Sequence, residues 1–92
     1  MLTIKFTSKM MRDVKRMLKR GKDLAKLETA LLLLSAQNPM PIVYRDHQLN
    51  GNLSDFRECH IEPDWLLIYQ IIDEKLILSA TETGTHSDLF GE

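Results

Sequence analysis

The start of the chain combines a strand pattern with a helix pattern. Residues 2–6, "LTIKF", alternate apolar and polar positions, which predicts a short strand. One apolar stripe then recurs every three or four positions, as on a helix: Met10, Met11, Val14, Met17 and Leu18. Thr7 or Ser8 can cap the start of this helix, and Gly21 is placed to end it in the left-handed conformation.

A second helix is predicted to begin after Asp23, which can serve as its N-cap. Its apolar seam is Leu24, Leu27, Leu31 and Leu34. The segment "QNPMP" ends this helix, because proline lacks a backbone N–H and biases the residue before it away from the α conformation. The connection between the two helices is one turn long, so we expect an antiparallel helical hairpin.

Strand patterns occupy the second half of the chain, at residues 55–61, 65–72 and 75–81. The tripeptides "EPD" and "DEK" between them are short enough for tight hairpins. The segment "WLLIYQII" is apolar on both faces, as in a central strand covered by helices. Residues 42–54 have the composition of a polar connection, and "THSDLF" suits one short helical turn. We therefore expect a single α+β domain, residues 1–92, of order β-α-α-β-β-β, with a small, mostly antiparallel sheet packed on the hairpin.

Length and composition agree with one domain in a reducing compartment. The chain has 92 residues, enough for one core, and it contains no apolar run long enough to span a membrane. The opening "MLTIKF" lacks the features of a secretory signal. The single cysteine, Cys59, cannot form an internal disulfide. We therefore expect a cytoplasmic protein without a membrane segment.

Charge is divided unevenly along the chain, although the net charge is only −1. Residues 1–45 hold 10 Lys and Arg against 3 acids, whereas residues 46–92 hold 2 against 10. The basic residues of the first predicted helix are Lys9, Arg12, Lys15, Arg16, Lys19 and Arg20. A basic face of this kind suits a polyanion or an acidic partner, but a solvated helix face without a partner has the same composition.

Candidate chemistry gathers beside the predicted turns and strand ends of the second half. Three histidines lie there: His47, His60 and His86. Histidine titrates near pH 6.5 and can act as an acid or a base. Asp64 follows a proline in a hairpin turn, and the aromatic residues Trp65 and Phe90 adjoin these polar groups. Aromatic surfaces beside histidines suit stacking on an unpaired base.

Each of these residues also has a structural explanation. Asp64 can close an Asx turn, Trp65 can be a core residue, and His60 can be a half-buried strand residue. The histidines and Cys59 could bind a metal, but the paired spacings of zinc sites are absent, and Cys59 and His60 point to opposite faces of a strand. We expect no metal and no other cofactor. The residues alone indicate a small α+β domain, with acid–base chemistry on an anion as its candidate function.

Three segments, in this order and spacing, resemble the YafQ-like branch of the RelE/ParE toxin superfamily: "YRDHQLNG", "DFRECHIEPDWLLIYQI" and "TGTHSDLF". The string H-x-E-P-D-W-x-L-I-Y is specific, and more so when it is joined to the upstream D-H-x-L and the terminal T-G-T-H-x-x-L-F. The resemblance extends from the first strand to Phe90. It implies the fold expected above.

The resemblance implies a ribosome-dependent mRNA endonuclease that a cognate antitoxin holds inactive. Its partners would be the antitoxin, the ribosome and mRNA, with operator DNA reached only through the antitoxin. The implied reaction needs no metal: the RNA 2′-OH attacks the adjacent phosphate and leaves a 2′,3′-cyclic phosphate and a 5′-OH. Such a transfer needs a base, an acid and stabilisation of the negative charge that develops.

The family's functional positions map onto His47, His60, Asp64, Trp65, His86 and Phe90. His86 and Asp64 are the expected acid–base pair, in either order. His47 and His60 would contact phosphate or share in proton transfer, and Trp65 and Phe90 would hold a base. The six basic residues of the first helix would dock the toxin on ribosomal RNA and on the antitoxin.

One position departs from the family pattern. Relatives usually have arginine before "TGTH", and this chain has Glu82. An arginine there would pair with the scissile phosphate, whereas a carboxylate repels it. The resemblance then implies an attenuated toxin or, alternatively, an inactive module that binds the antitoxin and represses transcription with it. Two further alternatives are a topoisomerase poison, which does not need the histidines, and a metal-dependent nuclease, which a chelator would inhibit.

Overall fold

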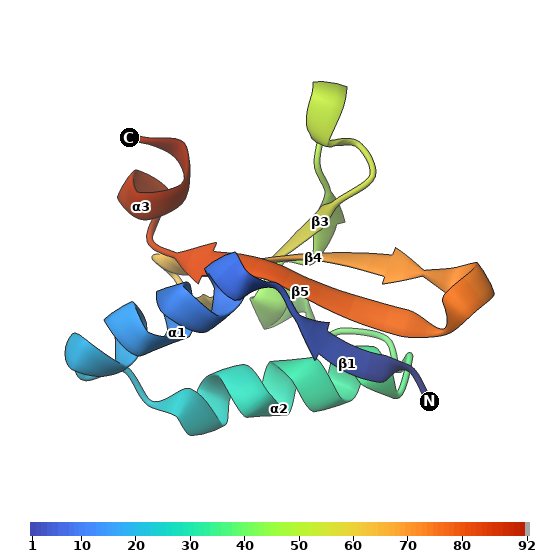
Figure 1. Ribbon diagram of the computed structural model, residues 1–92, viewed down its shortest axis with the longest axis horizontal. Helices are drawn as coiled ribbons and strands as arrows, with labels where there is room; N and C mark the ends of the chain where they lie inside the picture. Colours follow the sequence, from blue (N-terminus) through green and yellow to red (C-terminus); the bar gives the residue numbers. More distant parts are fainter. Residues whose placement is uncertain (92) are drawn as a thin grey trace.

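A five-stranded sheet carries two long helices on one face and a short helix on the other (Figure 1). The computed structural model describes residues 1–91. The strands are β1 (Thr3–Phe6), β2 (His47–Gln48), β3 (Arg57–Glu62), β4 (Trp65–Ile72) and β5 (Ile77–Gly84). The α-helices are α1 (Ser8–Lys19), α2 (Leu24–Ser35) and α3 (His86–Phe90), and 3-10 turns lie at η1 (Ile42–Tyr44), η2 (Gly51–Leu53) and η3 (Asp73–Lys75).

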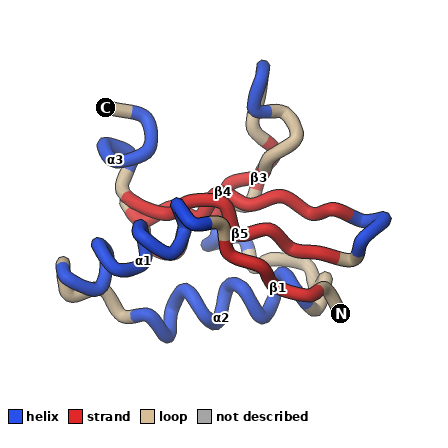
Figure 2. The backbone as a smooth tube through the Cα atoms, in the orientation of Figure 1, coloured by secondary structure: helices blue, strands red, loops and turns tan. Residues whose placement is uncertain are grey.

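The strand order is β1-β5-β4-β3-β2, with β4 in the centre as its apolar sequence predicts. The strand β1 pairs in parallel with β5, and the other neighbours are antiparallel. Figure 2 shows the strands in red, with the helix α2 beneath them. This confirms the expected α+β fold. The segment 42–54 differs from the prediction, because it contains β2 and two 3-10 turns rather than an irregular connection. Two-residue strands and 3-10 turns are too short to leave a periodic signal.

The two predicted helix starts are confirmed. The Thr7 hydroxyl accepts a hydrogen bond from the Met10 backbone N–H at 3.0 Å, and Asp23 caps α2 in the same way. Gly21 has φ +83° and ends the first helix, where a side chain would be strained. Among residues 1–91, no helix has the length and apolar character that a membrane crossing requires.

The apolar stripe of α1 is narrower than the sequence predicts. Met10 and Met17 are buried, but Met11 and Leu18 are 55% and 47% exposed. The face between the two buried methionines instead buries Asp13, whose carboxylate accepts a hydrogen bond from the Thr83 backbone N–H at 3.1 Å. A polar contact therefore occupies part of the interface between α1 and the sheet, and the sequence period alone does not reveal it.

The core lies between the two long helices and the inner face of the sheet. Its buried members include Leu27, Leu31 and Leu34 from α2, Trp65, Leu67 and Tyr69 from β4, and Leu78 and Ala80 from β5. Alternate residues of a strand point to the same face, so the intervening residues of β4 face the opposite, outer side. That outer side is where α3 and the β2–β3 connection lie (Figure 1).

A β-bulge in β5 changes which of its residues face outward. Ile68 pairs with Glu82, and the next residue, Tyr69, pairs with Ala80, so Thr81 is the extra residue. Strict alternation from Ala80 would turn Glu82 into the core. With the bulge, Glu82 shares the outer face of Ile68, and Thr83 turns inward, where it is fully buried.

Candidate active site

The candidate site begins with a histidine and an aspartate from two different turns. Asp64 lies in the tight turn between β3 and β4, and His86 is the first residue of α3. Oδ1 of Asp64 accepts hydrogen bonds from the His86 backbone N–H at 2.9 Å and from its ring Nδ1 at 2.6 Å. Among residues 1–91, no side chain hydrogen-bonds the other ring nitrogen, Nε2. The predicted pair is therefore brought into direct contact, with one ring nitrogen left for a substrate.

The same contacts set the charge of Asp64. Donation from the His86 backbone N–H, and then from its ring, lowers the pKa of the Asp64 carboxyl. An ionised carboxylate accepts but does not donate, so His86 Nδ1 carries the proton in this pair. The hydrogen bonds of Asp64 go to His86, and not to an Asx turn of its own.

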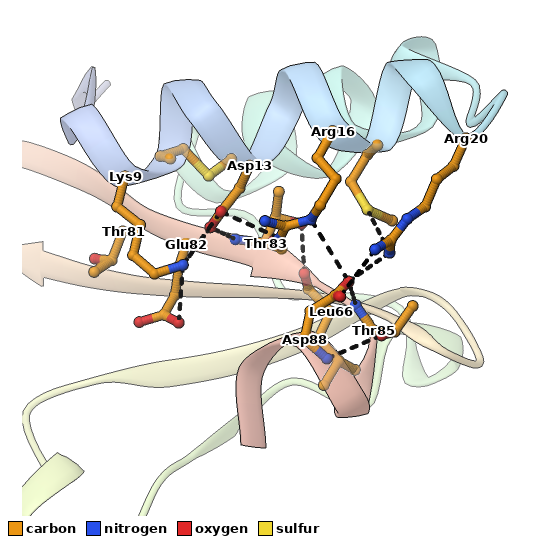
Figure 3. A network of polar contacts seen from close by, with 12 residues as sticks. Lys9, Asp13, Arg16, Arg20, Leu66, Thr81, Glu82, Thr83, Thr85 and Asp88 are labelled. Atoms are coloured by element: carbon orange, nitrogen blue, oxygen red, sulfur yellow. Dashed lines mark hydrogen bonds and ion pairs between the residues drawn. The ribbon is translucent and has the colours of Figure 1, made fainter. Parts of the chain in front are cut away.

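The helix that carries His86 is held in place by a capping box at its start and by ion pairs with arginine side chains of the first long helix. Thr85 caps it, and Asp88 completes a capping box by accepting from the Thr85 backbone N–H at 2.9 Å. Asp88 also accepts two hydrogen bonds from the Arg20 guanidinium, at 2.6 and 3.0 Å, and lies 3.8 Å from Arg16 (Figure 3). The Arg20 contact is the main reason that the pKa of Asp88 is held well below its usual range. We call Arg16, Arg20 and Asp88 the α1–α3 clamp.

The other two histidines meet around a buried acid. Glu58 is only 6% exposed, and its Oε1 lies 3.7 Å from His47 Nε2 and 3.5 Å from His60 Nε2. His47 faces Glu58 across the β2–β3 pair, and its Nδ1 lies 2.7 Å from the Arg45 carbonyl oxygen. The His60 and His86 rings are 5.9 Å apart between centroids. All three histidines thus gather on the outer face.

Glu58 is a site residue that the sequence prediction missed. The signal was available, because Glu58 and His60 are two positions apart in one strand and so share a face. Glu58 therefore places one carboxylate oxygen within 3.7 Å of both the His47 and the His60 rings.

The segment that carries His47 is anchored through the residue before it. Asp46 accepts a hydrogen bond from Arg57 at 2.9 Å and another from the Tyr69 hydroxyl. Burial, with the Asp46 contact second, raises the pKa of Tyr69 well above its ordinary value. Tyr69 is therefore a neutral donor that ties the start of β2 to the central strand.

Trp65 does not take the predicted role of holding a base. Its side chain is 1% exposed and belongs to the core, and its Nε1–H donates to the Thr83 hydroxyl at 2.9 Å. A ring enclosed on all sides has no face free for stacking. The prediction was wrong because strand alternation places position 65 with Leu67 and Tyr69 on the inner face. The structural explanation, a core tryptophan, is the one that the structure shows.

Phe90 lies at a pocket on the outer face, and it belongs to the same short helix as His86. The pocket has a volume of about 240 Å³ and is lined by Leu53, Phe56, Ile68, Thr81, Glu82, Leu89 and Phe90. Phe90 is 39% exposed, so its ring is accessible. Glu82 lines the same pocket, and its Oε1 lies 3.8 Å from Lys9 Nζ, which reaches across from α1 (Figure 3). We call this the Glu82 pocket.

The basic face of α1 divides into two sets. Three of its six predicted docking residues are held in ion pairs within the molecule: Lys9 with Asp13 and Glu82, Arg16 with Asp13 and Asp88, and Arg20 with Asp88. The other three, Arg12, Lys15 and Lys19, are exposed and make no ion pair within residues 1–91. Their spacing of three and four positions puts them on one side of the helix.

The remaining reactive group is the thiol of Cys59, which is also a candidate metal ligand. Cys59 is buried, and burial is the main cause that raises the pKa of its thiol to about 12, so it is protonated near neutral pH. In the described part of the chain, residues 1–91, no three His, Cys, Asp or Glu side chains come together in a way that could hold a metal ion.

The fold is a small sheet with a helical hairpin on one face and a histidine–aspartate pair on the outer face. These features place the chain among small α+β proteins with a candidate acid–base site. Comparison with known proteins is more specific. Residues 2–91 match the family described as "Bacterial toxin of type II toxin-antitoxin system, YafQ". The chain belongs to this YafQ toxin family, which confirms the resemblance drawn from its motifs.

Relatives match over nearly their whole length. The mRNA interferase toxin YafQ of Escherichia coli strain K12 is 43% identical over 89 residues, 96% of this chain and 95% of that protein. The crystal structure of a metal-bound toxin from Helicobacter pylori has a TM-score of 0.93 at 43% identity and covers 98% of this chain and 100% of its own. YafQ in the crystal structure of the E. coli DinJ–YafQ complex has a TM-score of 0.89 at 40% identity, covering 99% and 100%.

Proposed function

We propose that this protein is an mRNA interferase, the toxin of a type II toxin–antitoxin system. The observation that carries the proposal is the contact between His86 Nδ1 and Asp64 Oδ1 at 2.6 Å, with the His60 ring 5.9 Å from that of His86. Two imidazoles at this separation can serve opposite sides of one phosphate. The relative from E. coli that is named an mRNA interferase supports the choice of substrate.

The proposed reaction is an internal transfer that needs no added water. The 2′-oxygen forms a bond to phosphorus, and the bond from phosphorus to the 5′-oxygen breaks. One group takes the proton of the 2′-OH, and another gives a proton to the leaving oxygen. His86 takes one of these roles through Nε2, and His60 takes the other. Asp64, with its lowered pKa, is a poor acid and instead fixes the tautomer and orientation of His86.

The histidines beside Glu58 bind the phosphate in this mechanism. Ring N–H groups of His47 and His60 donate to the non-bridging oxygens, where negative charge develops. Glu58 lies between the two rings, with its Oε1 3.5 to 3.7 Å from both. Phe90 positions a base of the substrate, because its ring is accessible at the edge of this face.

We propose the ribosome as the place of cleavage and the exposed row of α1 as its docking surface. Arg12, Lys15 and Lys19 are free to contact phosphates of ribosomal RNA, whereas the other three predicted docking residues, Lys9, Arg16 and Arg20, already have internal partners. This refines the expected docking set from six residues to three.

A cognate antitoxin is the proposed protein partner, and the solved complex of a relative with DinJ supports it. Contact with operator DNA would then occur only through the antitoxin. An inactive module that binds the antitoxin and represses transcription with it is the second candidate function. The specific observation in its favour is Glu82, which lies on the outer face at the position where the family resemblance implies an arginine.

We propose that Glu82 attenuates the enzyme. Its carboxylate shares the outer face with Ile68 and Glu58, so it adds negative charge beside a site for an anion. The Lys9 contact at 3.8 Å offsets this charge only in part, because the Lys9 ammonium also pairs with Asp13 at 3.0 Å. Losing one positioned donor typically costs a factor of about 10² to 10³ in rate.

The test is to induce the chain in cells that lack the antitoxin and to map growth and mRNA ends. The matched variants are Glu82→Arg, His86→Ala and Asp64→Ala. Growth arrest by the unmodified chain, abolished by His86→Ala, supports the enzyme. Arrest by Glu82→Arg alone would show that the site is intact but silenced by one charge. No arrest by either chain, with both folded and able to bind antitoxin, would leave the inactive module as the function.

A further inference from the structure

The Glu82 pocket has the size and position of a site for one nucleobase. Its volume of about 240 Å³ has room for a base without its sugar and phosphate. Two of its lining residues, Leu89 and Phe90, belong to α3, the helix that begins with His86. Phe90 is one helical turn from His86, roughly 6 Å along the axis. A base in this pocket would therefore lie one nucleotide from the reacting groups.

Five of the seven residues that line the pocket are apolar, and two of these five carry aromatic rings. Phe56 follows the turn η2, Phe90 ends α3, and Ile68 of the central strand forms the floor. Phenyl rings stack on the faces of unpaired bases, and such stacking does not distinguish one base from another. The apolar walls therefore favour binding of a base, and the polar residues of the lining determine which base binds.

Among the pocket-lining residues that the structure describes, Glu82 is the one that carries a charge, and its chemistry restricts which base fits. The bulge at Thr81 turns it to this side of the sheet, where its side chain is 27% exposed. A carboxylate offers two acceptor oxygens and no donor. Guanine presents two adjacent donors on its Watson–Crick edge, N1–H and the N2 amino group. Adenine and cytosine place an acceptor nitrogen beside a single amino donor, and uracil flanks its N3–H with carbonyl oxygens.

We propose that the Glu82 pocket selects guanine, with the carboxylate accepting both Watson–Crick donors. This inference rests on the proposed function, because it assumes an RNA substrate. The single charge of Glu82, at the position where the family resemblance implies an arginine, would then have two effects on RNA binding. The carboxylate lowers the general affinity for RNA, which is phosphate-driven, and adds a preference for one base.

The test measures binding of RNA that cannot be cleaved. The probes are 2′-O-methyl oligouridines with one central variable base: guanine, hypoxanthine, adenine, cytosine or uracil. Hypoxanthine lacks only the N2 amino group. We expect the unmodified protein to bind the guanine probe about tenfold or more tightly than each other probe, as for a bidentate base contact. Fluorescence anisotropy at fixed salt gives the dissociation constants.

Two variants separate the pocket from a general charge effect. Glu82→Gln keeps the size of the side chain but replaces one acceptor by a donor, so the guanine preference should disappear while overall affinity stays equal or rises. Glu74→Gln removes the same charge from the exposed turn η3 and should leave the preference intact. Equal binding of all five probes, or a guanine preference that survives in Glu82→Gln, would overturn the proposal. Cleavage without guanine preference would overturn this inference alone, and guanine preference without cleavage would overturn the proposed function alone.

Discussion

A single oxygen atom, Oδ1 of Asp64, fixes both the backbone and the ring of His86. Replacing Asp64 with asparagine leaves a side chain of the same shape that can present a donor to Nδ1, so the ring can adopt the wrong tautomer. We expect cleavage to fall by about 10² to 10⁴-fold, with the free energy of unfolding almost unchanged because both side chains are exposed. Single-turnover cleavage and urea unfolding measure the two quantities. Asp55→Asn, in an exposed loop, is the matched control, and an equal loss of cleavage there would contradict the assignment.

Substitution of Trp65 is a second test on a single residue. If Trp65 is a core residue, its substitution should change stability, whereas a role in RNA binding predicts a change in RNA affinity. Trp65→Phe removes ring volume and leaves the Thr83 hydroxyl without its indole donor. We expect a loss of about 2 to 3 kcal/mol in the free energy of unfolding and unchanged RNA affinity for the folded fraction. Urea titration and RNA binding below the unfolding transition check this. Weaker RNA binding at unchanged stability would restore the base-holding role.

Single residues show where sequence reasoning succeeds and where it stops. His86 and Asp64 could be paired because both follow turn signals, and a specific motif surrounds each of them. Trp65 was assigned wrongly because its motif neighbours are catalytic candidates, whereas its burial depends on strand alternation. Glu58 was missed because an acid in a strand belongs to no motif, although its spacing of two from His60 puts both on one face. Its importance comes from the His47 and His60 side chains that reach it from two strands.

The α1–α3 clamp is the feature that matters most at the scale of elements. The pKa of Asp88 is lowered in the folded state, so this carboxylate contributes stability that is complete above its unfolded pKa of about 3.9 and is lost as the pH falls through the folded value. Asp88→Asn should lower the free energy of unfolding by about 1 kcal/mol at neutral pH. It should also reduce the loss of stability between about pH 5 and pH 2. Thermal unfolding across this range measures both effects.

The clamp also makes a functional prediction, because α3 carries both His86 and Phe90. The Asp88→Asn variant should hold α3 less firmly. We expect its cleavage rate to fall by more than its small loss of global stability explains. Ser87→Ala, on the exposed side of the same helix, is the control. Equal cleavage by Asp88→Asn and the unmodified chain would show that the clamp serves stability alone.

Local sequence signals predicted where most helices and strands begin and end. They did not predict which face of the sheet each residue of the last strand points to. Both long helices begin at the predicted caps, and the strand at 65–72 has its predicted bounds. The last strand begins at Ile77 and runs to Gly84, three residues beyond the predicted end, since the bulge at Thr81 interrupts the alternation by which a strand is recognised. A bulge depends on cross-strand pairing. The sequence therefore could not show that Glu82 faces outward and Thr83 inward.

At the scale of the whole molecule, the charge asymmetry of the chain is partly neutralised within the fold. Basic residues of α1 pair with acids from the second half, and the exposed row Arg12, Lys15 and Lys19 is left for a polyanion. Replacing all three with glutamine should make the slope of log K against log salt for ribosome binding shallower by about 2 to 3. Sites of cleavage should not change. Lys75→Gln, on the turn η3, is the control, and an unchanged slope in the triple variant would contradict the docking surface.

The pairing of β1 with β5 has a consequence for how the protein is made. The first strand finds its sheet partner in the last, and the hydrogen bond from the Thr7 hydroxyl to the Thr81 carbonyl joins residues 74 positions apart. Contacts of such separation close late, because loop-closure entropy must be overcome first. A nascent chain that has not yet emerged through β5 can close neither its sheet nor its site, since His86 follows that strand directly. Folding and the capacity to cleave RNA would thus be acquired together, near the end of synthesis, and a chain interrupted before β5 would be harmless to the cell that makes it.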